Sequence, residues 1–369
     1  MASPKPRPAI ESLVSYQPAF GKPPAGRPIR LSANEGALGC SPHVAEALKN
    51  TDLQLSRYPE PQDYHLITDI AERYQLEAER ILLSNGSDEL IYLLCQAYLD
   101  PGDEAIHTQY GFLVFPQSIS VAGATPVVAP DDGMTVSVDA ILAAVTERTK
   151  MVFLANPNNP TGTMIDEAEV RRLQAGLPES VLLVLDLAYS EFMGNAMDYA
   201  ADMVENSENT VMLRTFSKLH GLASVRLGWG YFPPEILAVL RSIRGPFSVN
   251  QIAVLAGRAA IADRDFQQRS SDHNNRWIPE VTSRLAELGL TVHPTVANFF
   301  LVQFDGHNGP RADQALEFFR QQGILLRDMI PYGLPDCLRM SIGTDAEMEQ
   351  VIACFADLMS DSGPGASGR

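Results

Sequence analysis

The sequence predicts an α/β protein with a large, mostly parallel sheet and a smaller α+β part after it. Between residues 81 and 243, short apolar runs alternate with amphipathic helical stretches, which is the pattern of α/β folds. Runs such as 181–185 are apolar without alternation, so both faces of these strands are expected to be covered, as in a parallel sheet. After about residue 263 a long polar helical stretch leads into short strands, which predicts the second part.

The elements of the large part follow from this periodicity. Strands are expected at residues 81–84, 104–107, 126–129, 151–155, 181–185, 211–214 and 227–232. Helices are expected at residues 88–99, 138–145, 167–175 and 234–243. The first helix has apolar residues along one side, as a helix covering a sheet should.

The smaller part is expected to begin with a helix at 265–288 and to end with one at 345–359. Between them we expect strands at 290–293, 299–303, 324–327 and 338–342, and a helix at 311–322. The domain division that follows is an N-terminal arm (1–35) belonging to the small domain, a large domain (36–262), a small domain (263–359) and a tail (360–369), which is disordered by composition.

Composition excludes several classes of function. The net charge of -17 argues against nucleic acid or an anionic membrane as the main partner, because both need basic surface. The four cysteines form no C-x-x-C pair, and no histidine spacing suggests a metal site, so no metal is expected. No apolar run approaches a membrane span, and the start lacks the apolar segment of a signal peptide, so a cytoplasmic protein is expected.

Lys218 is the most informative residue. The chain has only five lysines, and the other four lie in contexts that predict solvated side chains. Lys218 follows an apolar strand and is surrounded by hydroxyl, glycine and apolar residues (Leu213-Arg-Thr-Phe-Ser-Lys-Leu-His-Gly-Leu). An amine in such a place can lose its proton and act as a nucleophile. A lysine that condenses with an aldehyde is typical of pyridoxal phosphate chemistry.

The strand at 81–84 runs into Asn85-Gly-Ser-Asp-Glu and then a helix. The free N–H groups and dipole of a helix start can bind an anion, Gly86 would allow close approach, and Ser87 adds a hydroxyl. Taken alone, a helix cap made by Ser87 or Asp88 explains this segment better.

Two further polar segments follow strands. The run Asn156-Pro-Asn-Asn-Pro-Thr-Gly is explained by a turn, but a turn at the carboxyl end of a buried parallel strand lies where open α/β sheets bind ligands. Asn159 there could bond a ring oxygen. Asp186 closes another buried strand; its carboxylate needs a partner, and a pyridinium N–H would fit, whereas an exposed helix cap is the alternative.

Three arginines are candidates for anion binding. Arg226, in apolar surroundings, could bind phosphate with both arms of its guanidinium, or could pair with an internal carboxylate. Arg327 and Arg339 lie at strand ends in the small part and could clamp two anionic groups of a substrate; two surface arginines are an equally good interpretation.

In this order, these segments resemble those of the fold-type I pyridoxal-phosphate aminotransferases. The set is Asn85-Gly-Ser-Asp-Glu, Asn156-Pro-Asn-Asn-Pro-Thr-Gly, Asp186-x-Ala-Tyr189, Ser217-Lys218 and Arg226. Within that family, the chain resembles the histidinol-phosphate aminotransferases in Arg57-Tyr-Pro-Glu-Pro-Gln, Ala297-Asn-Phe, Ile324-Leu-Leu-Arg-Asp and Cys337-Leu-Arg-Met-Ser-Ile-Gly-Thr. The similarity covers residues 10–358.

The resemblance implies a role for each matching residue. Lys218 would bind the cofactor covalently and then move a proton, and Asp186 would hold the pyridine nitrogen. Asn159 and Tyr189 would bond the ring oxygen. The other cofactor contacts would be Tyr110 against the ring, Gly86, Ser87, Asp88, Ser217 and Arg226 at the phosphate, and Tyr58 at the phosphate of the other subunit of a homodimer. Substrate would be bound by Arg339 at its α-carboxylate, with Arg327 at its phosphate and Tyr16 and Asn159 also at the site.

The resemblance thus implies transamination between L-histidinol phosphate and 2-oxoglutarate in histidine biosynthesis. An aromatic aminotransferase, an amino-acid-phosphate decarboxylase and a pyridoxal-phosphate-binding regulator are alternatives. Three departures from the family pattern stand out: Tyr16-Gln-Pro-Ala, Asn34-Glu-Gly-Ala, and Leu187 after Asp186. The first two are expected near the substrate entrance.

Overall fold

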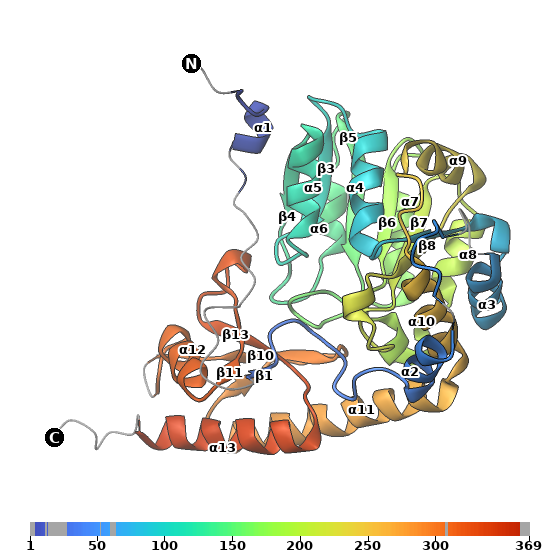
Figure 1. The fold of residues 1–369 in the computed structure, drawn as a ribbon. Coiled ribbons are helices and arrows are strands. Elements are labelled where there is room, and N and C mark those ends of the chain that lie inside the picture. The colour runs from blue at the N-terminus through green and yellow to red at the C-terminus, as the bar shows by residue number, and fades with distance from the viewer. Residues whose placement is uncertain are drawn as a thin grey trace.

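The computed structural model describes residues 4–11, 13, 28–51, 53–59, 64–306 and 309–361, apart from the side chains of 195–197 and 361. Its centre is a seven-stranded sheet in the order β2-β8-β7-β6-β5-β3-β4 (Figure 1). The strands are β2 (Ile81–Ser84), β3 (Glu104–Thr108), β4 (Thr125–Ala129), β5 (Thr149–Ala155), β6 (Leu182–Asp186), β7 (Thr210–Thr215) and β8 (Gly228–Tyr231). All seven predicted strands are therefore present, within one or two residues of their predicted ends.

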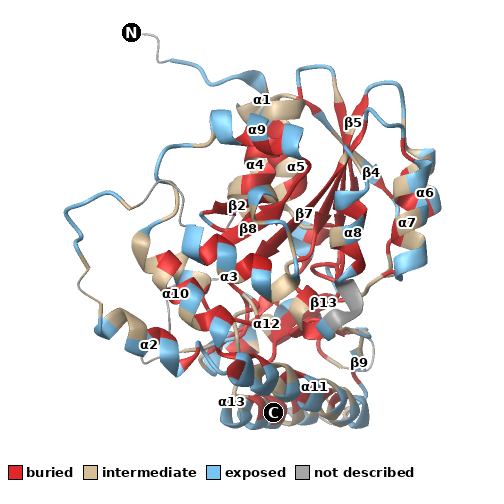
Figure 2. Cartoon of the chain, turned by 90° about the vertical axis from the view of Figure 1, so that its right-hand side faces the viewer, coloured by how far each residue is buried: buried red, intermediate tan, exposed pale blue. Residues whose placement is uncertain are grey.

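Helices cover both faces of this sheet, as the unbroken apolar runs predicted. Successive residues of a strand point to opposite faces: in β5, Val152 and Leu154 enter one core and Met151 and Phe153 the other. One face packs on α4 (Ser87–Tyr98), α5 (Val114–Ala122) and α9 (Pro234–Ile243). The opposite face packs on α2 (Pro42–Lys49), α3 (Tyr64–Tyr74), α6 (Val138–Ala143), α7 (Glu167–Gly176), α8 (Tyr199–Glu205) and α10 (Gln251–Ala262). Figure 2 shows the buried residues concentrated in the strands and on the inward sides of these helices.

One strand departs from the parallel arrangement. β8 runs antiparallel to both β7 and β2, whereas β4, β3, β5, β6 and β7 are mutually parallel. A parallel return needs a crossover, usually a helix, on one face of the sheet. The connection from β7 to β8 contains only a short 3₁₀ turn (Ala223–Val225), so the chain turns back beside β7. Lys218 lies in this connection.

The second part is built on a four-stranded antiparallel sheet in the order β12-β13-β10-β9. Its strands are β9 (Thr291–Val292), β10 (Phe299–Gln303), β12 (Arg327–Asp328) and β13 (Cys337–Ser341). It packs with α11 (Arg264–Glu287), α12 (Ala312–Gln321) and α13 (Asp345–Asp361) around a separate core. In Figure 1, α11 and α13 lie along the same edge of the molecule.

Two predictions for this part need correction. The single strand expected at 324–327 is two strands, because β11 (Ile324–Leu325) pairs with β1 (Ile29–Arg30) and the chain then crosses to pair β12 with β13. Residues 360 and 361, which were expected in the tail, belong to α13, which continues to Asp361, and the Ser360 hydroxyl donates to the Ala356 carbonyl oxygen at 2.8 Å. Residues 362–369 lie outside the described residues.

The pairing of β1 with β11 joins residues 29–30 to the smaller part, in the way expected of the arm; α1 (Pro8–Glu11) precedes it. The domain boundaries at 35, 262 and 359 stay predictions. Among the helices of the described residues, none combines the length and the apolar character needed to span a bilayer.

Candidate active site

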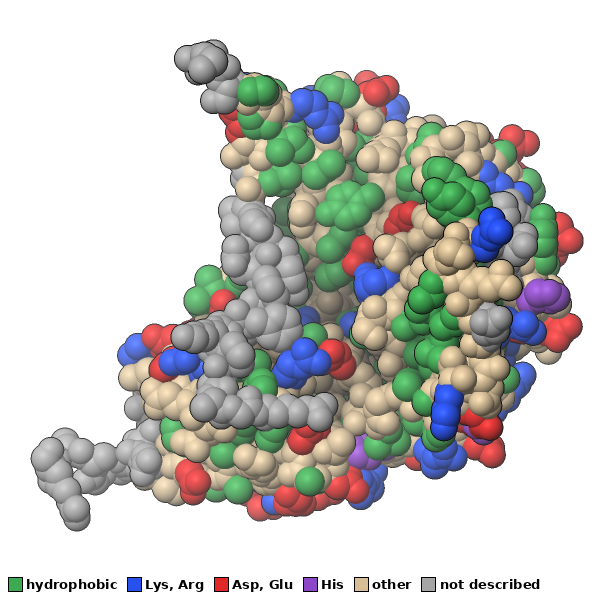
Figure 3. Space-filling view, in the orientation of Figure 1, with side chains coloured by type: hydrophobic (Ala, Val, Ile, Leu, Met, Phe, Trp, Pro, Cys, Tyr) green, Lys and Arg blue, Asp and Glu red, His purple; other side chains and the backbone are tan. Residues whose placement is uncertain are grey.

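A cavity of about 240 Å³ lies where β5, β6 and β7 end, between the large sheet and the smaller part. The molecular surface is hollowed between these two parts, with charged and apolar side chains around the hollow (Figure 3). The carboxyl ends of parallel strands are where open α/β sheets bind ligands. The predicted site residues that line this cavity are Ser87, Asp88, Asn159, Asp186, Tyr189, Ser217, Lys218, Arg226 and Arg339.

Lys218 places an amine at the cavity wall. The residue is half-buried, and its Nζ donates a hydrogen bond to the Ala33 carbonyl oxygen at 3.3 Å. Burial and, next, the positive charge of Arg339 lower the pKa of Lys218 to about 8, against the opposing effect of Asp88. A substantial fraction of the amine is therefore neutral near physiological pH, which is the form that attacks a carbonyl carbon.

Asp186 places a carboxyl group at the end of β6. It is 5% exposed, and its Oδ1 accepts a hydrogen bond from the Ala188 amide at 3.1 Å. Within the described residues no arginine or lysine forms an ion pair with it. Burial raises the pKa of Asp186 to about 7, which a cationic N–H donor in the cavity would reverse. The exposed helix cap considered as an alternative is therefore wrong.

The start of α4 forms one wall. Gly86 is the residue before the helix and provides no side-chain cap, so the cap by Ser87 or Asp88 is not what the structure shows. Gly86 has a φ of 79°, and a Cβ there would stand 2.4 Å from an Arg226 nitrogen. An uncapped helix start beside a guanidinium is a favourable site for an anion.

Arg226 connects the start of α4 with Ser217. Its Nη2 lies 3.4 Å from Asp88 Oδ2, and its Nη1 donates to Ser217 Oγ at 3.5 Å. The internal ion pair considered as an alternative is therefore present, but both side chains are 42% exposed and both line the cavity. The guanidinium is thus held in place while still open to a ligand.

Two residues of this wall were not predicted from the sequence. Gly228 of β8 faces the helix start, where a Cβ would stand 2.4 Å from the Ser87 amide nitrogen. Thr215 lines the cavity, and its hydroxyl oxygen accepts a hydrogen bond from the Ser217 amide at 3.1 Å. Glycine in a strand and threonine next to a hydroxyl-rich loop were visible in the sequence, but the approach of Gly228 to the start of α4 depends on the pairing of β8 with β2.

Tyr189 is held by Asn34, in the segment Asn34-Glu-Gly-Ala that departs from the family pattern. Its hydroxyl accepts a hydrogen bond from Asn34 Nδ2 at 2.8 Å, and burial raises its pKa to about 12. Asn34 is 1% exposed and adopts a φ of 55°. The predicted location of this segment near the site is confirmed, since Ala33, Asn34 and Glu35 line the cavity.

Arg339 and Arg327 are buried, at 5% and 6% exposure, so the surface interpretation is wrong. They face each other directly across the antiparallel pair β12–β13, which places their side chains on the same side of the sheet. Arg339 donates to Asn159 Oδ1 and, at 3.0 Å, to the Ser32 carbonyl oxygen, while its Nε has no hydrogen bond among the described residues. No carboxylate of the described residues forms an ion pair with Arg339.

Four predicted residues do not line the cavity. Arg327 lies opposite Arg339 on the neighbouring strand, and Gly86 is the residue that precedes α4. Tyr110 packs with an apolar cluster that includes Tyr332, and Phe112 from the same segment lines the cavity with Tyr332 instead. Tyr58 is 82% exposed and stacks on Phe247, with ring centroids 4.6 Å apart. Tyr16 lies outside the described residues.

The family described as aminotransferase class I and II matches residues 27–355. The chain belongs to the class I and II aminotransferases. The histidinol-phosphate aminotransferases of Rhodospirillum centenum and Paramagnetospirillum magneticum are 46% and 45% identical to this aminotransferase, over 97% of its length and 99% of theirs.

A solved relative agrees in fold with this aminotransferase. The histidinol-phosphate aminotransferase from Sinorhizobium meliloti, crystallised in complex with pyridoxal-5'-phosphate, superimposes with a TM-score of 0.89 at 26% identity, covering 98% of this chain and 99% of that one. The fold-type I aminotransferase architecture expected from the sequence is confirmed.

We expect Lys218 to be the lysine of this aminotransferase that is acylated fastest near neutral pH. Its lowered pKa of about 8 leaves more neutral amine than an ordinary lysine has. Mass spectrometry of the ligand-free protein after brief acylation should show modification of Lys218 rising through a midpoint near pH 8. Lys150 serves as the internal comparison, and modification of Lys218 that lags behind it at pH 8 would contradict the assignment.

Proposed function

We propose that this chain catalyses amino-group transfer between L-histidinol phosphate and 2-oxoglutarate, with pyridoxal phosphate as its cofactor. The observation that carries the proposal is the placement of buried Arg339 in the wall of the cavity that holds Lys218, whose pKa is lowered to about 8, with buried Arg327 directly opposite Arg339 on the neighbouring strand. The names and nearly full-length similarity of the curated relatives support the same substrate.

The cavity fits the proposed cofactor. Its phosphate would be held by the start of α4, Ser217 and Arg226, where the missing Cβ of Gly86 leaves room for the guanidinium. Asp186, a buried carboxyl without an ion-pair partner in the described residues, suits a protonated ring nitrogen. Tyr189 and Asn159 would bond the ring oxygen.

Bound pyridoxal phosphate supplies an aldehyde that condenses with amines and a protonated ring that accepts electrons from the substrate carbon. Lys218 would first hold the cofactor covalently. Its Nζ would take the proton from the substrate Cα and deliver it to C4′ of the cofactor, because its pKa lies close to the working pH. Asp186 would hold the protonated ring nitrogen and, by remaining ionised beside it, would stabilise its positive charge.

The two arginines would orient both substrates in one site. The Arg339 guanidinium, with a free Nε, would bind the α-carboxylate of glutamate. Arg327 would bind the phosphate of histidinol phosphate and, in the other half of the reaction, the second carboxylate of glutamate. An aromatic amino acid lacks this second anion, so it would gain nothing from Arg327.

We further propose a homodimer. The segment 53–59 carries Leu55 and Tyr58 with exposures of 75% and 82%, and a partner subunit would cover them. Tyr58 would then reach the phosphate in the partner's site. The cytoplasmic location expected from the sequence stays a prediction.

We expect Lys218→Ala to reduce transamination by about 100-fold to 10,000-fold or more, because the group that moves the Cα proton is removed. The measurement is glutamate formed from 2-oxoglutarate and histidinol phosphate, together with the absorbance of the protein after incubation with pyridoxal phosphate. Lys150→Ala is the matched control and should behave as the unaltered chain. Full turnover by Lys218→Ala would falsify the proposal.

We expect Arg327→Gln to raise the KM for histidinol phosphate by about 10-fold to 100-fold, the range expected for lost hydrogen bonds between charged groups. The KM for phenylalanine should change little. Arg320→Gln, on the exposed side of α12, is the control. A preference of the unaltered enzyme for phenylalanine over histidinol phosphate would instead support an aromatic aminotransferase.

We expect the chain to sediment as a dimer, with about twice the chain mass of 40.3 kDa. Tyr58→Ala should bind pyridoxal phosphate weakly, because each site would lack the partner's hydroxyl. Mixing Tyr58→Ala with Lys218→Ala subunits should restore activity, since each mixed dimer contains one site with both residues. A monomer, or no recovery on mixing, would rule out the shared site.

A further inference from the structure

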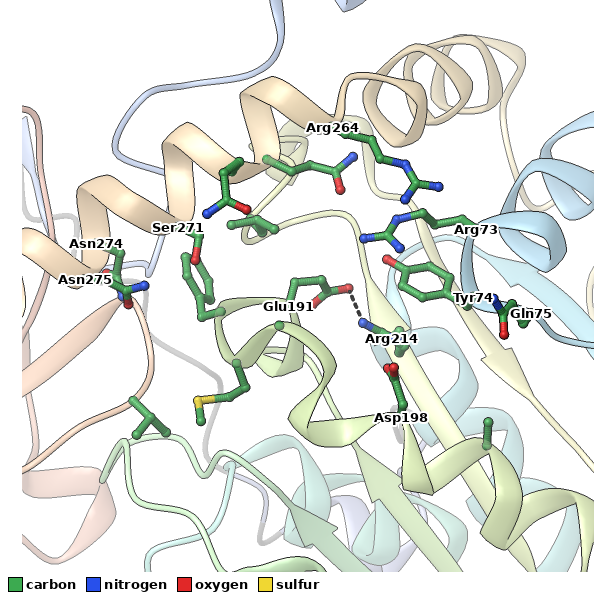
Figure 4. A pocket seen from close by; sticks show the side chains of 18 of the residues that line it. Arg73, Tyr74, Gln75, Glu191, Asp198, Arg214, Arg264, Ser271, Asn274 and Asn275 are labelled. Atoms are coloured by element: carbon green, nitrogen blue, oxygen red, sulfur yellow. Dashed lines mark ion pairs between the residues drawn. The ribbon is translucent and has the colours of Figure 1, made fainter.

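A second and larger cavity, of about 1050 Å³, has Glu191 and Arg214 in its wall (Figure 4). It is lined by residues of α3, β7, α11 and the 3₁₀ stretch Ser190–Met197. It contains none of the proposed catalytic residues. At its wall, Glu191 and Arg214 form an ion pair with Oε1 and Nη2 3.1 Å apart, and the two side chains are only 6% and 8% exposed.

This pair connects the two chain segments on which the chemistry depends. Glu191 follows Tyr189 by two residues and Asp186 by five; Arg214 precedes Ser217 by three and Lys218 by four. Asp186 and Leu213 are the last paired residues of β6 and β7, and the Leu187 amide makes the final ladder bond, to the Leu213 carbonyl oxygen at 2.9 Å. Beyond this point, in the described part of the chain, no backbone hydrogen bonds of the sheet join the segment after β6 to the segment after β7. The ion pair and an apolar cluster of Tyr189, Phe192 and Leu219 join them there.

Arg214 packs against two aromatic rings. Its guanidinium carbon lies 4.2 Å from the centroid of the Tyr74 ring and 5.5 Å from that of Trp229. Other charged groups nearby are Arg73 and Asp198, which also line the cavity. Neighbouring His220 stays neutral, since burial and then the charges of Arg214 and Arg73 lower its pKa to about 3. The guanidinium therefore contacts these two rings while it pairs with Glu191.

A buried ion pair contributes little stability compared with apolar residues of similar size, because both charges lose their hydration. Such a pair can fix how two chain segments lie relative to each other, because its two partners must meet in one geometry. We propose that Glu191 and Arg214 are positioning residues that hold Asp186 and Tyr189 in register with Ser217 and Lys218 across the point where the ladder ends. In its effect on turnover, this inference rests on the proposed function.

The test compares Glu191→Gln with the apolar double variant Glu191→Leu/Arg214→Met. Glu191→Gln keeps the shape but loses the charge, whereas the double variant removes both charges and so avoids an uncompensated one. In both, kcat should fall by about 10-fold to 100-fold with KM changed less than about threefold, as expected when catalytic groups are misplaced. The urea midpoint of the double variant should stay close to that of the unaltered chain.

A second readout does not need the cofactor. The pH midpoint for acylation of Lys218 in the ligand-free protein should shift in both variants, because the amine would move relative to Arg339, Arg226, Asp88 and Glu35. Glu349→Gln, which removes one partner of the exposed pair between Glu349 and Arg284, is the control and should change neither readout.

An unchanged acylation midpoint and unchanged kcat in the double variant would overturn the positioning role. Unfolding of the double variant would also count against it, because the pair would then serve stability. Absence of transamination by the unaltered chain would contradict the proposed function alone, since the acylation midpoint still reports on the pair.

Discussion

Removal of water from a few ionisable groups is the constraint on which this site depends. Burial disfavours the charged form of any group, so it acts on an amine and a carboxyl in opposite senses. Here it lowers the pKa of Lys218 to about 8 and raises that of Asp186 to about 7. The same cavity therefore holds a nucleophilic amine and a carboxyl that gains from a cationic partner, and both properties suit a cofactor with an aldehyde and a basic ring nitrogen.

The fold makes this burial possible without loss of access. The ends of β5, β6 and β7 bring Asn159, Asp186 and Lys218 to one edge of the sheet, and the smaller part supplies Arg339 from the opposite side. Close backbone approach at Gly228 and Gly86 leaves the start of α4 within reach of Arg226. The site is therefore assembled from segments that are far apart in the sequence and share no local structure.

Charge is distributed very unevenly between surface and site. The chain carries a net charge of -17, yet Arg327 and Arg339 are buried on adjacent strands, where like charges directly opposite each other are unfavourable. An anionic ligand at Arg339 would bring negative charge to this pair. The acidic exterior and the basic interior together favour small anionic substrates and disfavour large polyanions.

Much of this could be predicted from the sequence, because strand burial, helix periodicity and the order of short polar motifs are local properties. The seven strands, the two-part organisation and most of the residues around the cavity follow from them, with Lys218 and Asp186 as the clearest cases. Tertiary structure alone decided the rest. The return of β8 beside β7, the split of 324–327 between two sheets, the presence of Phe112 at the cavity wall, and the contact between Glu191 and Arg214 all depend on which distant segments meet. Local sequence patterns do not determine these long-range contacts, because the contacts result from how complete helices and strands pack.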